Sequence, residues 1–335
     1  MTKKVKAMAS VGIAIPCYNY GRYLRECVAS VLSQGVDDVR ILIVDNASTD
    51  DSADIARAIA AEEPRVEVLA REKNMGPHAS FNAGVDWAPT DYFMVLCADD
   101  LLAPGCLSNA VAVMEADKSI AFTYGTDVHH NVDEPFPVLT APADPNWRIW
   151  TGDRFIEDRC RNPEHYIAAG HVLVRTSAQK QAGHYRTELP HTDDFEMLLR
   201  LARYGGVAYT RAPQGIKRMH ASNRTHDYLA ERTRDLAERL SALECFFRNE
   251  GASMPEAERL MKLGRRSLAE RAYWSGVRDW ARGRESAGAL FKFARELEPS
   301  TAYLPPVSYL LRMDRPLGQI IAETVSDTFR GSRAA

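Results

Sequence analysis

Short apolar runs rich in β-branched residues alternate with helical patterns over the first part of the chain. These runs are SVGIAIP, VRILIVD, VEVLA, DYFMVLC and IAFTYG. Strands that are apolar throughout, rather than on alternate residues, are typical of a parallel sheet that helices cover on both faces. The pattern therefore predicts an α/β fold with a mainly parallel central sheet.

The loops that follow these runs are the natural place for a binding site. Ligands of open parallel sheets bind at the carboxyl ends of the strands. The loops after the first four runs are CYNYG, DNASTD, EKNMGPH and ADD, and all of them are polar. We therefore expect these loops to meet at one edge of the sheet and to form the site there.

The character of the sequence changes after about Asp227. Strand-like runs disappear, and segments rich in Ala, Leu, Arg and Glu continue to Leu297, which predicts helices. A chain of 335 residues has room for one large domain and a smaller one, since most domains contain about 100–200 residues. We predict an α/β domain over residues 1–226 and a helical region over residues 227–335.

Three segments connect the predicted sheet to this helical region. Residues Thr126–Trp150 contain several prolines and little periodicity, which predicts an irregular connection. Residues His165–Val174 have the composition of a strand. The apolar spacing after Thr192 predicts a helix that begins near that residue.

Composition argues against several classes of protein. The chain has 42 basic and 45 acidic residues, a net charge of −3 and a pI near 6.3, so we expect no affinity for nucleic acid that depends on counterion release. The six cysteines show no CxxC spacing, which indicates reduced thiols rather than disulfides or a structural zinc site.

The N-terminal segment imitates a secretory signal only in part. Basic residues precede the apolar run Val11–Ile15, but Pro16 ends that run and no small-residue cleavage site follows. No stretch approaches the roughly 18 consecutive apolar residues that a membrane-spanning helix needs. We expect a cytoplasmic protein that is at most associated with a membrane surface.

Asp99 and Asp100 come directly after the fourth apolar run. Two adjacent carboxylates at the carboxyl edge of a sheet suit Mg²⁺ or Mn²⁺, which bind carboxylate oxygens and share their other positions with phosphates. The alternative is that the two acids cap the following helix. The pair alone does not decide between these roles.

Several segments occur in an order that matches a known family. They are IPCYNYGRYLRECVASVLSQ, ILIVDNASTD, NMGPHASFNAG, CADD and TDDFEMLLRLARYGG, with RMHASN after them. Over roughly Val11–Thr225 this order resembles family 2 glycosyltransferases of the GT-A fold. The resemblance implies that a sugar moves with inversion from a nucleoside-diphosphate donor to an acceptor hydroxyl, with Mn²⁺ or Mg²⁺ as cofactor.

The resemblance also assigns residues to the donor. Asp45 and Asn46 would lie beside the base and ribose, and Asp99 near the ribose and the metal. Backbone amides at the helix start after the third strand can face a phosphate group. The full predicted donor set is Pro16, Cys17, Tyr18, Asn19, Asp45, Asn46, Asn74, Gly76, His78 and Asp99.

Three positions depart from the family pattern. Asn46 stands where the family often has the Asp that accepts the N3–H of uracil, so a UDP-linked donor is not assigned and dTDP-linked sugars stay open. Cys97 replaces the first acid of the metal motif and is interpreted as a packed side chain. Phe81 stands where many relatives have Arg.

The metal and catalytic assignments follow the same resemblance. Asp100 would be the direct metal ligand, with Asp99 and His220 beside it. Asp193 and Asp194 match the family's Glu-Asp element, in which Asp194 would accept the proton of the acceptor hydroxyl; an Asp with an ordinary pKa of about 3.9 is already ionised for this. The alternative for both acids is a favourable interaction with a helix N-terminus.

The partners are less specified than the donor. The acceptor would be a glycan or a lipid-linked sugar, with contacts expected in Thr126–Trp150 and His165–His171, and fold analogy points to bacterial surface polysaccharide synthesis. Trp and Arg residues of the helical tail are compatible with a membrane surface, or with packing on the same chain or in a homodimer. A non-catalytic sugar-binding protein is the alternative function.

Overall fold

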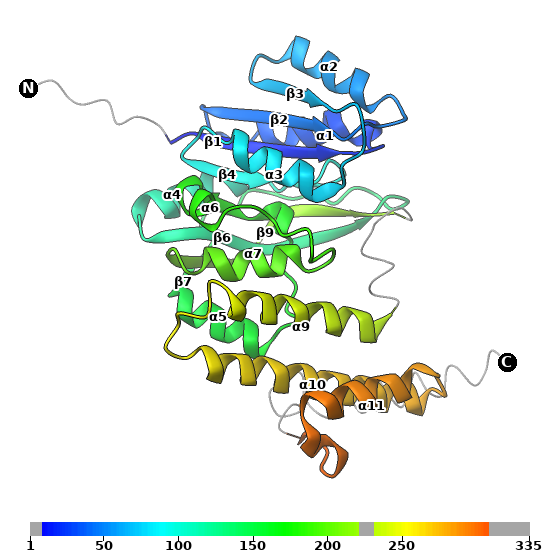
Figure 1. The fold of residues 1–335 in the computed structure, drawn as a ribbon. Helices are drawn as coiled ribbons and strands as arrows, with labels where there is room; N and C mark the ends of the chain where they lie inside the picture. The colour runs from blue at the N-terminus through cyan, green and yellow to red at the C-terminus, as the bar shows by residue number, and fades with distance from the viewer. Residues whose placement is uncertain (1–8, 221–230, 308–335) are drawn as a thin grey trace, which may run out of the picture. The chain divides into compact units, whose positions relative to one another are not determined.

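A computed structural model describes residues 9–220 and 231–307, which fall into two compact units (Figure 1). The first, here called the sheet unit, comprises residues 1–156 and 166–223. The second, the helical unit, comprises residues 157–165 and 224–335. The domain boundary expected after residue 226 lies outside the described residues, and the short segment 157–165 belongs to the helical unit.

Four strands form the parallel half of the sheet, as the apolar runs predict. They lie side by side in the order β3-β2-β1-β4, and all three neighbouring pairs are parallel (Figure 1). The strands are β1 (Val11–Cys17), β2 (Val39–Asp45), β3 (Val66–Ala70) and β4 (Tyr92–Val95). Because they are parallel, their following loops meet at one edge.

Helices cover both faces of this half. Ile13 and Ile15 of β1 belong to a large buried cluster with Leu24 and Leu107, whereas Ala14, between them, packs with Phe93 in a separate cluster on the other face. The helices are α1 (Gly21–Leu32), α2 (Ser52–Glu62), α3 (Pro77–Trp87) and α4 (Cys106–Ala116).

Gly84 lets α3 approach the sheet closely. A Cβ atom at Gly84 would lie 2.4 Å from the Cβ of Ala14, closer than packed carbons can come. The helix backbone therefore rests directly on β1, which fixes the position of the loop at the start of α3 relative to the strand.

The second half of the sheet is mixed. Strands β8 and β4 are antiparallel, as are β8 and β6, while β6 and β9 are parallel and β5 and β7 are antiparallel to β9. The strands are β5 (Leu101–Leu102), β6 (Ile120–Asn131), β7 (Arg148–Trp150), β8 (Leu173–Arg175) and β9 (Gly206–Met219).

The structure corrects two expectations for this half. Residues 126–131 continue β6 and residues 148–150 form β7, so only the middle of the segment Thr126–Trp150 lacks regular structure. Most of His165–Val174 is not a strand, because it holds the short helix η1 (Ala169–His171) before β8 begins. The helices that complete this part of the chain are α5 (Gly152–Arg161), α6 (Thr176–Ala182) and α7 (Asp193–Leu201).

The helical unit is built on helix pairs. Gly264 of α10 allows close contact with α9, because a Cβ atom there would lie 2.7 Å from a methyl group of Leu243. Arg271 Nε donates to Glu164 Oε2 at 2.8 Å, which holds segment 157–165 against the helices. The elements are α9 (Arg232–Arg248), α10 (Ala257–Ala281), α11 (Ser286–Leu297) and η2 (Pro299–Ala302).

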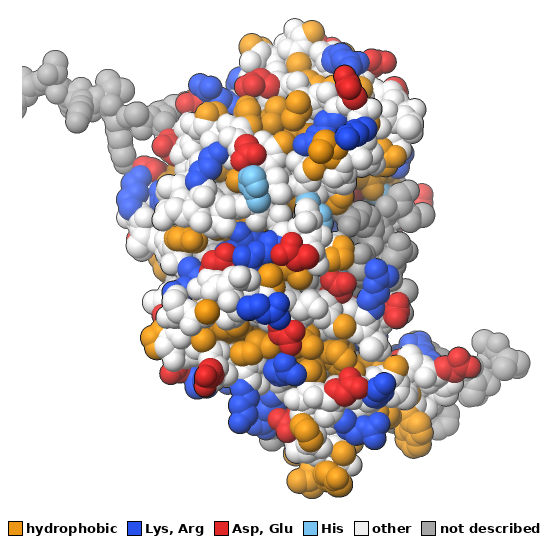
Figure 2. All heavy atoms as spheres, viewed as in Figure 1, with side chains coloured by type: hydrophobic (Ala, Val, Ile, Leu, Met, Phe, Trp, Pro, Cys, Tyr) orange, Lys and Arg blue, Asp and Glu red, His pale blue; other side chains and the backbone are white. Residues whose placement is uncertain are grey.

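Surface charge, helix hydrophobicity and the state of the cysteines can be compared with what the composition predicts. On the face seen in Figure 2, basic and acidic side chains are interspersed rather than separated into patches of one sign. Among the helices of residues 9–220 and 231–307, none is long and apolar enough to cross a membrane. All six cysteines lie in these ranges and each is a free thiol.

Candidate active site

The loops after β2 and β3 are tied together by the side-chain amide of Asn46. Its Nδ2 donates to Asn74 Oδ1 at 2.8 Å and to the carbonyl of Gly76 at 3.2 Å, and its Oδ1 accepts from the backbone amide of Met75 at 3.0 Å. An Asp at this position could not donate either of the first two bonds. The departure from the family pattern at Asn46 thus has a structural reason.

A second tie joins the loop after β1 to the loop after β2. Asn19 has φ 59°, its backbone amide donates to Ser48 Oγ at 3.0 Å, and its Oδ1 accepts from the amide of Thr49 at 2.8 Å. Ala47 also adopts a left-handed backbone, with φ 60°. Non-glycine residues rarely hold this conformation unless their surroundings impose it, and functional sites are where they gather.

The predicted donor residues of these loops differ in accessibility. Asp45 is 2% exposed; its Oδ2 accepts from the amide of Ser48 at 3.2 Å, and its Oδ1 is buried without a hydrogen-bond partner among the described residues. Cys17 belongs to the core, where burial raises its pKa to about 11, while Tyr18 is well exposed. Tyr18 and Asn19 can therefore reach a ligand more readily than Cys17.

Asp99 and Asp100 do not cap a helix. The residues that follow them form β5, and α4 begins only at Cys106. Asp100 Oδ1 accepts from the backbone amide of Arg218 at 3.1 Å, and His220 Nε2 lies 3.1 Å from Asp99 Oδ2. The end of β9 therefore brings the predicted His220 to the acidic pair.

The acidic pair has the chemistry of a cation site. Cys97 Sγ and carboxylate oxygens of Asp99 and Asp100 lie within 4.8 Å of one another. Burial, and then the neighbouring Asp99, raise the pKa of Asp100 to about 8. Burial also raises the pKa of Cys97 well above its ordinary value, so this sulfur is a neutral thiol and the oxygens are the better ligands. Oxygen ligands fit Mg²⁺ or Mn²⁺.

Aromatic residues at the start of α1 hold His220 in place. Its ring stacks on Tyr23, with centroids 5.6 Å apart, and meets Tyr20 edge-on at 5.4 Å. The Arg218 guanidinium also lies over the Tyr23 ring, 4.7 Å from its centroid, and pairs with Glu26. Sequence analysis missed Tyr20, Tyr23 and Glu26, although they lie in the segment YGRYLRE directly after the predicted donor residues 16–19.

The second acidic pair lies in the first turn of α7. Thr192 is the N-cap residue, and Asp194 Oδ1 accepts from the amide of Phe195 at 2.6 Å. His78 Nε2, from the first turn of α3, lies 3.2 Å from Asp193 Oδ2. His78 was expected at the donor, and the structure places it beside the predicted catalytic pair.

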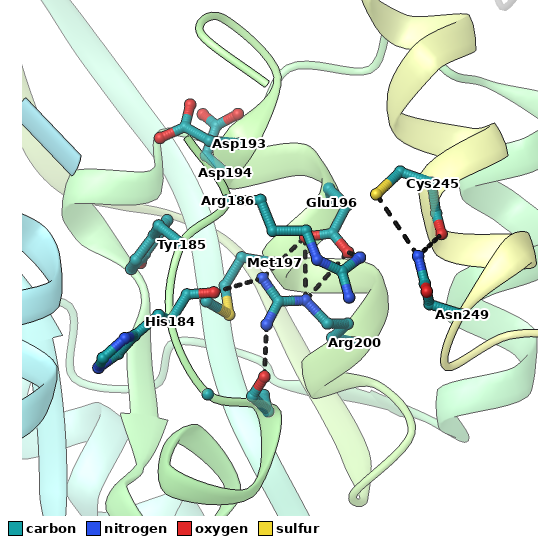
Figure 3. Close-up of polar contacts among 12 residues, drawn as sticks. His184, Tyr185, Arg186, Asp193, Asp194, Glu196, Met197, Arg200, Cys245 and Asn249 are labelled. Atoms are coloured by element: carbon teal, nitrogen blue, oxygen red, sulfur yellow. Dashed lines mark hydrogen bonds and ion pairs between the residues drawn. The ribbon is translucent and has the colours of Figure 1, made fainter. Parts of the chain in front are cut away.

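A buried ion-pair cluster anchors α7 (Figure 3). Glu196 is fully buried, and its carboxylate accepts from Arg200 Nε at 2.9 and 3.0 Å and from Arg186 Nη1 at 2.5 Å. Arg200 also donates to the carbonyls of Ala182 and His184, the latter at 2.8 Å. The cluster fixes the helix that carries Asp193 and Asp194 to segment 182–186.

Tyr166 lies within electrostatic reach of both acidic pairs. Burial raises its pKa, and the carboxylates of Asp127, Asp194 and Asp100 raise it further. Its hydroxyl accepts a hydrogen bond from Lys217 Nζ at 2.8 Å. The short helix η1 lies near both pairs, because Ala169 lines a small cavity with Asp194 and a Cβ atom at Gly170 would lie 3.8 Å from Asp100 Oδ2.

Comparison with known proteins identifies relatives of this chain. The model of "Glycosyl transferase family 2" matches residues 12–180. Chondroitin synthase of Escherichia coli is 26% identical over 233 residues, which is 66% of this chain and 32% of the relative. The match thus spans about a third of that relative's length.

Solved structures share the fold. The mannosyltransferase PcManGT of Pyrobaculum calidifontis, in complex with GDP-Man and Mn²⁺, superposes with a TM-score of 0.56 at 18% identity, covering 91% of this chain and 86% of that one. TarS of S. aureus (residues 1–349), in complex with UDP-GlcNAc, gives 0.54 at 15% identity, covering 88% and 91%. These likenesses establish a GT-A-like fold.

We expect Mn²⁺ binding to depend on pH through Asp100. Below about pH 8 this carboxyl is mostly protonated in the metal-free protein, so the ion competes with a proton. The affinity for Mn²⁺ should rise by up to about tenfold per pH unit from about pH 6 and level off above about pH 8. Titration with Mn²⁺ followed by electron paramagnetic resonance measures this, and Asp100→Asn should bind weakly at every pH. Equal wild-type affinity at pH 6 and pH 8 would contradict the assignment.

Arg200→Met should destabilise the sheet unit strongly. It leaves the buried carboxylate of Glu196 with a reduced set of donors, and breaking one side of a buried ion pair typically costs about 3–5 kcal/mol. Urea unfolding followed by circular dichroism gives the change in the free energy of unfolding. Arg57→Met is the matched control, because the Arg57–Asp54 pair is exposed and its loss should change little. Similar stability of both variants would show that the cluster does not anchor α7.

Proposed function

Because the chain belongs to glycosyl transferase family 2, we propose that it is an inverting glycosyltransferase that uses a nucleoside-diphosphate sugar. The acceptor is a hydroxyl group of a glycan or a lipid-linked sugar. The observation that carries the proposal is the buried pair Asp99 and Asp100 with His220 beside it, next to the short helix η1, whose Ala169 lines a small cavity with Asp194. A donor site and a base within one site are what direct displacement requires.

The donor would bind across the loops after β1, β2 and β3. The buried and unpartnered Oδ1 of Asp45 offers an acceptor for a hydroxyl or N–H of the nucleoside. Asp100 and Asp99, with His220 beside them, would hold Mn²⁺ or Mg²⁺, which when bound stabilises the negative charge of the departing diphosphate. The chemistry of the oxygen donors fits either ion.

Asp194 would act as the base. The acceptor oxygen forms a bond to the anomeric carbon while the bond from that carbon to the phosphate oxygen breaks, and the proton of the acceptor hydroxyl passes to the Asp194 carboxylate. Asp193, beside His78, would orient the start of α7 rather than take the proton. The buried Glu196–Arg200 pair helps to hold α7, which carries both acids, in position.

The biological setting is proposed from the relatives. A chondroitin synthase is a polysaccharide-forming enzyme by name, so we place this chain in surface polysaccharide synthesis. It would work in the cytoplasm, where it meets its donor, and at the inner face of the membrane if the acceptor is lipid-linked. Exposed Trp280, near Arg278 on α10, is compatible with such peripheral contact, and a homodimer is the competing use of this surface.

Nucleotide binding tests the donor site. We expect one of UDP, dTDP, GDP and CDP to bind with higher affinity in the presence of Mn²⁺, as measured by isothermal titration calorimetry. Asp100→Ala should abolish the gain that Mn²⁺ produces, because the ion loses its main ligand. Asp54→Ala, an exposed acid of α2, is the control. Binding of no nucleotide would contradict the proposal, and a Mn²⁺ effect that survives in Asp100→Ala would place the ion elsewhere.

Asp194→Asn tests the base. Turnover should fall by about 10²–10⁴-fold, because an amide cannot take up the proton, while nucleotide affinity stays close to that of the wild type. Release of free nucleoside diphosphate from the donor sugar, with and without acceptor, provides the assay. Asp54→Asn again serves as the control. Undiminished turnover would remove Asp194 from the mechanism, and wild-type protein that binds donor without turnover would favour the non-catalytic alternative.

A further inference from the structure

Cys97 opens a tight turn that brings three ligand-forming side chains together. The backbone amide of Asp100 donates to the carbonyl of Cys97 at 3.0 Å, and this bond closes the turn over residues 97–100. Ala98, inside the turn, is 1% exposed and belongs to the hydrophobic core. The side chains of Cys97, Asp99 and Asp100 instead converge, because the sulfur and one carboxylate oxygen from each acid lie within 4.8 Å of one another.

The sulfur of Cys97 has different surroundings from those of neighbouring thiols. Cys27 and Cys106 are buried members of the main hydrophobic cluster, whereas Cys97 is only partly buried and does not belong to it. A Cβ atom at Gly170 of η1 would lie 3.8 Å from the sulfur and 3.8 Å from Asp100 Oδ2. Both atoms therefore lie beside the same glycine, which has no side chain to separate them from a ligand.

The two acids are held so that their oxygens stay beside the sulfur. Asp100 Oδ1 accepts from the backbone amide of Arg218 at 3.1 Å, while Oδ2 of the same carboxylate is the atom that lies near Gly170. Asp99 Oδ2 lies 3.1 Å from Nε2 of His220, whose ring is packed between aromatic residues of the first helix. The turn and the end of β9 thus gather a sulfur, two carboxylates and an imidazole.

We propose that Cys97 is a metal ligand, and that it makes this site bind thiophilic divalent ions, above all Zn²⁺, in preference to Mn²⁺. The inference rests on the proposed function, because it concerns the same metal site. Zn²⁺ binds Cys sulfur at about 2.3 Å and His nitrogen or carboxylate oxygen at about 2.0–2.2 Å in a tetrahedron, so its donors lie about 3.3–3.6 Å apart. The separations of up to 4.8 Å in the turn, and of 3.1 Å between Asp99 and His220, need only small side-chain rotations to reach this spacing.

Hard and thiophilic ions use this set of donors differently. Mg²⁺ and Mn²⁺ prefer oxygen, so they bind the carboxylates and leave the Cys97 thiol protonated. A thiophilic ion forms a bond to the sulfur while the S–H bond breaks, and the proton passes to solvent. Zn²⁺ binds most sites more tightly than Mn²⁺. The part of this preference that disappears with the sulfur is therefore what identifies Cys97 as a ligand.

Two spectroscopic titrations of the full chain test the assignment. Cd²⁺, a thiophilic substitute for Zn²⁺, produces an ultraviolet charge-transfer absorption when it binds a thiolate. Electron paramagnetic resonance measures Mn²⁺ binding and the displacement of Mn²⁺ by Zn²⁺. We expect the wild type to give the Cd²⁺–thiolate absorption and to release Mn²⁺ when Zn²⁺ is added.

Cys97→Ser should abolish this absorption and weaken Zn²⁺ binding by at least about tenfold, because loss of a group that merely supports a ligand already costs about 10–100-fold. The Mn²⁺ affinity of this variant should stay close to that of the wild type, since Mn²⁺ is held by the carboxylates. Retained Mn²⁺ binding also shows that the variant is folded. Cys97→Ala provides a second replacement with the same expected result.

Two further variants serve as controls. Cys245→Ser removes a partly buried thiol of α9 and should keep both the absorption and the Zn²⁺ affinity. Asp100→Asn should weaken Mn²⁺ and Cd²⁺ together, because both ions use its carboxylate.

The outcomes separate this inference from the proposed function. Cys97 is not a ligand if Cd²⁺ gives no thiolate absorption, if Cys97→Ser keeps the wild-type preference for Zn²⁺ over Mn²⁺, or if Cd²⁺ and Mn²⁺ bind together without competition. The proposed Mn²⁺ site stands in each of these cases as long as Mn²⁺ binds and Asp100→Asn weakens it. Absence of Mn²⁺ binding in the wild type would overturn the metal site and this inference with it.

Discussion

The hydrogen bond from the backbone amide of Arg218 to Asp100 is the contact on which the site depends. It joins the end of β9 to the acidic pair after β4, two segments 118 residues apart in the chain. The same stretch of β9 carries Lys217 to Tyr166 and leads to His220 beside Asp99. One strand therefore connects the predicted metal ligands with the aromatic residues around them, and a shift of its register would separate them all.

The parallel half of the fold and the start of β6 could be predicted from the sequence, and the rest of the mixed half could not. Strands β1, β2 and β4 are short apolar runs that are largely buried on both faces, and β3 at the edge of the sheet is a short run of the same kind that is partly exposed, so the pattern carries a clear signal. β9 reads GVAYTRAPQGIKRM, where a proline, glycines and charged residues hide a strand whose partners are distant. Thr126–Asn131 extends β6 only because β9 pairs with it, which is a tertiary effect that no local pattern contains.

The candidate site, too, could be predicted from the sequence only in part. The acids after β4 and at the start of α7 follow directly from position along the chain, but the partners that set their chemistry come from elsewhere. His78 meets Asp193 from α3, and Tyr23 supports His220 from α1. The buried acids also differ in how their charge is compensated. Asp100 lies beside another acid and has a raised pKa, whereas Glu196, in the helix of the second pair, is bonded to two arginines. Composition gives no indication of which acid receives which environment.

The amide of Asn46 has a consequence for how this sequence can evolve. Its two donated bonds span the loops after β2 and β3, and neither survives a simple change to the acid that relatives often carry there. A lineage that acquired the acid would have to replace Asn74 or reshape the turn at Gly76 in the same step or earlier. The two asparagines are thus a coupled pair, and homologues should gain or lose them together even though they lie 28 residues apart.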